Sequence, residues 1–160
     1  QTENDETAAA IQRAVIHAFS EVKRPKDHEL APHECWECAE IRQRLSPHSF
    51  DSVTDTDLDR LHDFLPLLGP KGLHYYLPAF ILRSLRECNW IGIENLIFYL
   101  SPTQTSLQER EDYWRDRLGV FSSQQRAVIL SFLDWLESSA VGPNYGTEIA
   151  AARKIWRLHA

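Results

Sequence analysis

The residues best suited to chemistry lie in one short stretch, residues 33–38, which holds two of the three cysteines and a histidine. The pattern His33-x-Cys35-x-x-Cys38 offers one imidazole and two thiols, ligand types that zinc prefers. A closed structural zinc site needs four ligands, usually with a second Cys or His pair further along the chain. No second pair with that spacing follows, so zinc bound by His33, Cys35 and Cys38 is the alternative interpretation and not the main one.

The two cysteines can also be read as a redox pair. At a helix N-terminus the helix dipole favours the thiolate form of a cysteine. The redox enzymes that use a Cys-x-x-Cys motif place it after a strand of an α/β domain, and the sequence predicts no such strand. Like-charge repulsion from Glu34, Glu37 and Glu40 also opposes ionisation of the thiols.

The main interpretation of this stretch is structural. Taking Pro32 as the first helical residue places Cys35 and Cys38 on one face of a short helix, and Ile41 continues that face. His33 then lies about 200° around the helix from Cys35, at about 100° per residue. Because free cysteine is among the most buried residue types, we expect the two cysteines to be small core residues.

Several segments of the sequence together resemble one protein family. They are Arg24-Pro25, Leu30, His33-x-Cys35-x-Glu37-Cys38, Leu77-Pro78-Ala79 and Phe121-Ser122-x-x-Gln125. The chain resembles, from Ile11 to Leu136, a family of small bacterial proteins described as a domain of unknown function. This resemblance implies a bacterial origin and a helical fold, and it supplies no activity and no catalytic residues.

Hydrophobic residues recur at helical spacing along most of the chain, which favours helices over strands. We predict helices over residues 5–23, 32–45, 54–68, 70–85 with a kink or restart at Pro78, 90–100, 108–118, 122–136, and from Thr147 onward. The fold class is therefore all-α, with about seven or eight helices in one irregular orthogonal or bundle-like domain over residues 1–160. Residues 1–6 are expected to form a disordered tail.

Two helix starts carry specific capping signals. Ser122 followed by Gln125 matches a capping box, and Phe121 stands where a hydrophobic staple residue belongs. Thr54 followed by Asp57 forms a similar pair, in which an acidic residue in the first turn is favoured by the helix dipole.

An acidic segment surrounds the second of these starts. Its members are Asp51, Asp55, Asp57, Asp59 and Asp63. The spacing briefly imitates a calcium-binding loop, but Arg60 stands where that loop needs glycine and Pro66 where it needs glutamate. Helix-start chemistry is the main interpretation, and a surface that binds a partner protein is the second.

Composition limits the classes of partner. The 160-residue chain is 43% hydrophobic and 25% charged, as in an ordinary globular protein, with a net charge of -6. Net negative charge disfavours nucleic acid and anionic membrane as partners, and no apolar run is long enough to span a bilayer. Three cysteines favour a reducing cytoplasm. Since the chain begins at Gln1 and has no methionine, we expect its start to have been trimmed or its residues renumbered.

The function predicted from these features is non-enzymatic. We expect a bacterial protein-interaction module of the inhibitor or immunity type, which masks a protein partner such as a toxin or effector. We expect no cofactor and no catalytic residues, because nucleotide-binding, hydrolase and metalloprotease motifs are absent from the sequence. The alternative is a zinc- or thiol-dependent protein, and a third hypothesis is an enzyme whose site assembles from distant residues such as His74, Tyr75 and Glu94.

Overall fold

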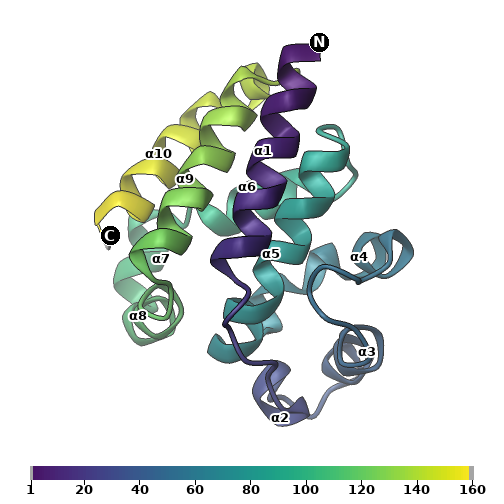
Figure 1. Ribbon diagram of the computed structural model, residues 1–160. Helices are drawn as coiled ribbons and strands as arrows, with labels where there is room; N and C mark the ends of the chain where they lie inside the picture. Colours follow the sequence, from purple (N-terminus) through teal and green to yellow (C-terminus); the bar gives the residue numbers. More distant parts are fainter. Residues whose placement is uncertain (1, 159–160) are drawn as a thin grey trace.

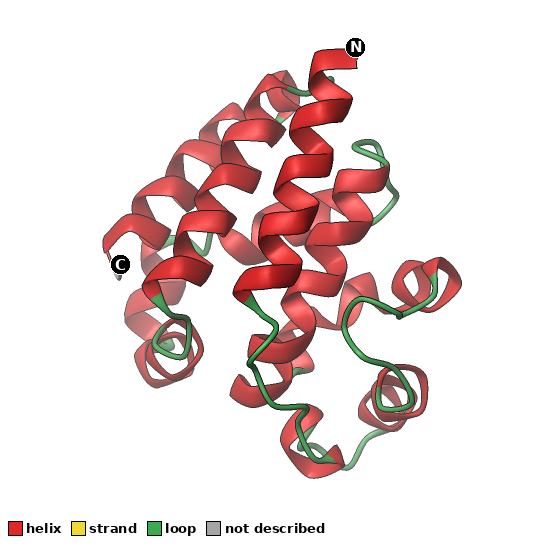
Figure 2. Cartoon of the chain, viewed as in Figure 1, coloured by secondary structure: helices red, strands yellow, loops and turns green. Residues whose placement is uncertain are grey.

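The structure is a computed structural model that describes residues 2–158, and every regular element in that part of the chain is helical (Figure 2). The elements are α1 (Thr2–Ala18), α2 (Asp27–Leu30), α3 (Trp36–Leu45), α4 (Asp55–Leu61), the 3-10 segment η1 (His62–Leu67), α5 (Pro70–Arg86), α6 (Ile93–Leu100), α7 (Gln104–Glu109), α8 (Glu111–Leu118), α9 (Ser123–Ser138), the 3-10 segment η2 (Gly142–Asn144) and α10 (Gly146–Leu158). The all-α prediction is confirmed. None of these helices has both the length and the apolar character needed to cross a membrane.

Helix α5 lies at the centre of the fold. Thirteen of its 17 residues are buried, and a helix that is buried on all sides belongs to a protein core. It contacts α1, α2, α4 and α8, so elements from both halves of the chain pack around it. The predicted restart at Pro78 does not occur, since α5 continues through this residue as one helix.

Helices α1, α9 and α10 form a layer over one side of α5 (Figure 1). Helix α9 lies between the other two and contacts both, while α1 also contacts α5. The apolar residues that recur at helical spacing in α9 are buried in this layer, at Val128, Ile129, Phe132, Leu133 and Leu136. The short helices α2, α3 and α4 lie on the opposite side of α5 and form a separate edge of the molecule (Figure 1).

The capping predictions hold to different degrees. At α9 the capping box is complete: Gln125 N donates to Ser122 Oγ at 3.1 Å, and Ser122 N donates to Gln125 Oε1 at 2.9 Å. At α4 only half of the pair forms, with Asp57 N donating to Thr54 Oγ1 at 3.2 Å. Thr147 is not a cap, because α10 begins one residue earlier, at Gly146.

Several predicted boundaries differ from the structure. Residues 2–6, expected in the tail, form the first turns of α1, and residue 1 lies outside the described part. The helix predicted over residues 108–118 is divided at Arg110 into α7 and α8, because Thr103 Oγ1 accepts a bond from Ser106 N at 3.1 Å and starts a helix earlier. The helix predicted over residues 90–100 begins only at Ile93, after a turn.

Candidate functional site

The cysteine stretch is arranged differently from the prediction. Helix α3 begins at Trp36 and not at Pro32, and Cys35 is its N-cap residue. The Cys35 sulfur accepts a hydrogen bond from Cys38 N at 3.4 Å. Cys35 is therefore half-buried at the end of the helix, while Cys38 is fully buried in its first turn.

An arginine of α3 explains why the helix starts late. The Arg42 guanidinium donates to the backbone oxygen of Ala31 at 2.5 Å and to that of His33 at 3.3 Å. These bonds hold the segment that leads into α3 against the side of the helix. Its Ala31 and His33 carbonyls are thus paired with a side chain instead of with N–H groups of a following helical turn.

The structure does not assemble the predicted zinc ligands. Among residues 2–158, no group of three or more His, Cys, Asp or Glu side chains is arranged to hold a metal ion. His33 is exposed, whereas Cys38 is buried. In this part of the chain, Cys35 and Cys38 therefore form a pair of thiols without the third ligand that the sequence pattern suggested.

The thiols of this pair lie in different environments. Burial, and after it the neighbouring Cys35 thiol, raises the pKa of Cys38. Cys35 is the more accessible of the two and lines a surface hollow of about 570 Å³. All three cysteines are free, and Cys88 lies elsewhere, half-buried between α5 and α6.

The acidic segment is largely paired within the protein. Three of its aspartates accept bonds from arginines: Arg86 to Asp55 at 2.5 Å, Arg44 to Asp57 at 2.8 Å and Arg83 to Asp59 at 3.3 Å. Asp51 accepts from the Ser49 hydroxyl at 2.8 Å. These contacts compensate most of the charge that the sequence suggested for partner binding.

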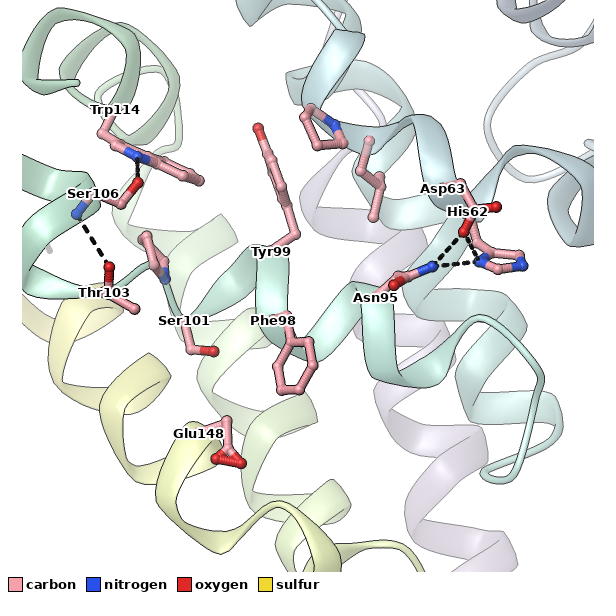
Figure 3. A pocket seen from close by; sticks show the side chains of 13 residues that line it. His62, Asp63, Asn95, Phe98, Tyr99, Ser101, Thr103, Ser106, Trp114 and Glu148 are labelled. Carbon is pink, nitrogen blue, oxygen red and sulfur yellow. Dashed lines mark hydrogen bonds and ion pairs between the residues drawn. The ribbon is translucent and has the colours of Figure 1, made fainter. Parts of the chain in front are cut away.

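The remaining aspartate, Asp63, lies 3.1 Å from His62 Nδ1 and lines a mainly apolar pocket. This pocket has a volume of about 530 Å³ and lies between η1, α6, residues 101–106, α8 and α10 (Figure 3). Its walls are mainly apolar or aromatic, formed by Leu65, Pro66, Phe98, Tyr99, Pro102 and Trp114. A concave, mostly apolar surface with few polar groups is typical of a binding site.

Tyrosine hydroxyls fix the middle of the pocket. The Tyr113 hydroxyl donates to the Pro66 carbonyl at 2.9 Å and lies 3.0 Å from the Tyr99 hydroxyl. Because Tyr113 uses its proton on Pro66, Tyr99 must be the donor between the two tyrosines. Burial of the phenol group raises the pKa of Tyr99 well above its ordinary value, so Tyr99 stays neutral and serves to position its ring.

The polar side chains at the two ends of the pocket are also engaged. At one end Asn95 Nδ2 lies 2.7 Å from His62 Nδ1 and 2.6 Å from Asp63 Oδ1. At the other end Trp114 Nε1 donates to Ser106 Oγ at 3.0 Å. These contacts hold the walls in place and leave the apolar faces open to a ligand.

The charged groups of the pocket are acidic. Asp63 and Glu148 are its two carboxylates, and no lysine or arginine is among the described residues that line it. Glu148 is half-buried, and within residues 2–158 it makes no ion pair. Figure 3 shows it on the side of the pocket opposite Tyr99, below Phe98. The pocket is therefore suited to an apolar group that carries or adjoins a positive charge.

The hypothesis of an enzyme site built from distant residues receives no support from the arrangement of its members. His74 Nε2 lies 2.8 Å from Gln125 Oε1, the Tyr75 ring packs against Phe50, and Glu94 Oε1 accepts from the Tyr145 hydroxyl at 3.5 Å. Each side chain thus has a separate partner in a different part of the fold.

Sequence reasoning missed the pocket because its lining comes from several elements that are distant along the chain. The only local signal is the run of aromatic residues Phe98, Tyr99, Tyr113 and Trp114, and helical spacing alone does not distinguish a core residue from a pocket residue. One of them, Phe98, is 48% exposed at the pocket, since α6 is covered on one side only.

Comparison with known proteins gives a family and no activity. Searches of curated proteins and of solved structures found no match. A family model described as a family of unknown function (DUF6714) matches residues 7–160. The match covers nearly the whole chain, and the protein therefore belongs to this family of unknown function.

Proposed function

We propose that this protein is a protein-interaction module that takes a large apolar side chain of its partner into the pocket, with a lysine or arginine of the partner beside it. The observation that carries the proposal is the pocket itself. Its volume of about 530 Å³ lies within the range of roughly 300–1,000 Å³ that is usual for ligand sites. Its walls are apolar, and both of its charged residues are acidic.

The rim of the pocket favours a protein over a small molecule as the ligand. Phe98 is 48% exposed there, and its ring makes an edge contact with Tyr145 at 6.1 Å. Exposed aromatic residues next to a pocket are the kind of group that dominates protein–protein binding energy. The net charge of -6 supports a basic partner, because complementary charge speeds association and selects partners.

The biological role that we propose follows from this chemistry. A module that covers a basic, apolar segment of another protein can mask it, as an inhibitor or immunity-type protein does. We place this role in the bacterial cytoplasm, where free thiols persist, with a toxin or effector as the partner. Of the acidic segment predicted to bind the partner, Asp63 alone lines the pocket, so the proposed surface moves from that segment to the pocket.

Selection of peptides from a random display library tests the proposal without knowledge of the natural partner. The peptides retained by the full chain are expected to be enriched in a large apolar residue next to lysine or arginine. Their affinity is expected to fall at least tenfold for Phe98→Ala, since truncating an aromatic anchor at an interface can remove about 2 kcal/mol or more of binding free energy. Glu148→Gln is expected to weaken peptides with the basic residue more than their neutral counterparts.

Ile16→Ala provides the matched control. Ile16 is also an exposed apolar residue, at 41%, but it lies on α1 and does not line the pocket. Its substitution is expected to leave peptide affinity unchanged. Peptides without a basic bias, or peptides that bind the Phe98→Ala and wild-type chains equally, would refute the proposal.

A further inference from the structure

We infer that Cys35 and Cys38 form a reversible disulfide by exchange with a low-molecular-weight disulfide, which makes this pair a redox modification site. This inference is independent of the proposed binding function. The Cys35 sulfur already accepts a hydrogen bond from Cys38 N at 3.4 Å, so its side chain points toward the residue that would become its partner. The N-cap and third helical positions lie about 5 Å apart between Cα atoms, within the range that a disulfide spans.

The accessibility of the two sulfurs assigns different roles to them. Cys35 is half-buried and faces a surface hollow of about 570 Å³ that is also lined by His28, Trp36 and Arg42. Cys38 is fully buried, so a small reagent cannot reach it directly. Cys35 is therefore the attacking thiol, and Cys38 is the thiol that resolves the intermediate.

The N-cap position of Cys35 supports the attack. The sulfur lies at the N-terminus of α3 and accepts the bond from Cys38 N, so it is held beside the residue that resolves the mixed disulfide. One of the nearby glutamates is also compensated, because Glu40 pairs with Arg60 at 2.6 Å and with Arg44 at 3.1 Å. The sequence had placed Cys35 inside the helix, where the bond from Cys38 N would not exist.

The exchange proceeds in two balanced steps. Cys35 gives its proton to solvent, and its thiolate attacks one sulfur of the small disulfide. The sulfur–sulfur bond of the reagent breaks, one small thiolate leaves, and a mixed disulfide remains on Cys35. The Cys38 sulfur then attacks the Cys35 sulfur, and the second small thiolate leaves. The proton of Cys38 passes to this leaving thiolate. Two protein thiols are oxidised by two electrons, and one small disulfide is reduced to two thiols.

Mass spectrometry of the folded chain tests the inference. The wild-type protein is equilibrated with mixtures of reduced and oxidised glutathione, quenched with acid, alkylated and digested with trypsin. The peptide spanning residues 27–42 contains both cysteines. As the oxidised fraction rises, this peptide is expected to lose two hydrogens and both alkyl groups together, while the Cys88 peptide stays alkylated. Added reductant should restore two alkylated thiols.

Single variants test the two roles. In the Cys38→Ser chain, one glutathione is expected to remain on Cys35 as a mixed disulfide. In the Cys35→Ser chain, Cys38 is expected to react with oxidised glutathione at least tenfold more slowly than Cys35 does in the Cys38→Ser chain. Circular dichroism shows whether each variant is folded, and the Cys88→Ser chain, in which both cysteines of the pair are native, should reproduce the wild-type result. The inference is overturned if the wild-type pair keeps both alkyl groups throughout the glutathione series, or if oxidation links separate chains instead.

Discussion

Tyr76 lies in the middle of α5 with its ring buried and its hydroxyl 2.8 Å from the carbonyl oxygens of both Leu45 and His48. Burial raises the pKa of this phenol to about 12, so it is a neutral donor at physiological pH. The bond joins the central helix to the C-terminal end of α3. A single hydroxyl thus helps to hold the helix that carries the cysteine pair.

Tyr76→Phe is expected to lower the free energy of unfolding by about 1–3 kcal/mol, because the His48 carbonyl oxygen loses its donor and the Leu45 carbonyl oxygen keeps only its bond from His48 N, at 2.9 Å. Urea unfolding followed by circular dichroism measures the change. Tyr75→Phe is the control, since this neighbouring ring is also buried but its hydroxyl makes no hydrogen bond among the described residues. Equal losses in the two variants would contradict the role given to the Tyr76 hydroxyl.

His74 is kept neutral by burial, and its ring is positioned by Gln125. The Gln125 side chain donates from Nε2 to the Ala18 carbonyl at 3.1 Å, and its oxygen accepts from Ser122 N at 2.9 Å. The same oxygen lies 2.8 Å from His74 Nε2, so that nitrogen must carry a proton and donate it. Burial lowers the pKa of His74 below its ordinary value of 6.5, which the bond to Gln125 only partly opposes.

This lowered pKa predicts a loss of stability in acid. The unfolded chain takes up a proton on His74 near pH 6.5, while the folded chain resists it. The stabilisation is therefore complete above that pH and declines as the pH falls through the folded pKa. His74→Gln is expected to reduce the drop in urea midpoint between about pH 7.5 and pH 5.5. The exposed His17, replaced by glutamine, is the control, and an unchanged drop in the His74 variant would refute this assignment.

Among the elements, α2 and α5 approach unusually closely, and glycine makes this possible. A Cβ on Gly72 would overlap the Leu30 carbonyl oxygen and lie 2.9 Å from the Leu30 Cα. A Cβ on Gly69 would lie 2.5 Å from the Glu29 carbonyl oxygen. Both contacts are with backbone, which cannot rotate away. These glycines therefore set the position of α2 and of the segment that follows it into Cys35.

Gly72→Ala is expected to destabilise the protein by about 1–3 kcal/mol through overpacking, although alanine normally gains about 1 kcal/mol over glycine inside a helix. Thermal or urea unfolding measures the difference. Gly146→Ala is the matched control, since a Cβ at that position, also in a helix, meets no atom within 4 Å. A Gly72 variant as stable as the wild type would show that α2 can move away from α5 without loss.

At the scale of the whole molecule, the buried residues form one continuous cluster. It runs from Ala8 in α1 to Trp156 in α10 and includes α5 throughout. The two sides of the fold therefore share a core, even though α2, α3 and α4 form a separate edge in Figure 1. A single contiguous core in a domain of this size favours cooperative unfolding.

We accordingly expect urea unfolding curves from far-ultraviolet circular dichroism and from tryptophan fluorescence to coincide. The five tryptophans report on different parts of the fold, from Trp36 at the N-terminus of α3 to Trp156 in α10. Circular dichroism instead averages over all helices. A fluorescence transition at lower urea than the helical signal would contradict the expectation and would show that part of the structure unfolds separately.

The sequence by itself determined the helices and most of the buried stripes, because both depend on residues three or four positions apart. Leu58, Leu61, Leu65 and Leu68 recur at spacings of three and four residues within the predicted helix 54–68, and all four are buried. The capping box of Ser122 and Gln125 is complete. Short helices and boundaries were less predictable, since their ends depend on single contacts such as those of Arg42.

Only the tertiary structure decided the candidate sites. The pocket takes its lining from elements that are far apart in sequence, so no local spacing could reveal it. The arginines that neutralise Asp55 and Asp59 come from α5, a separate helix. The N-cap role of Cys35 depends on bonds from Arg42 across the segment before α3. Local periodicity specifies a helix, but the partners of a side chain are set by how the helices pack against one another.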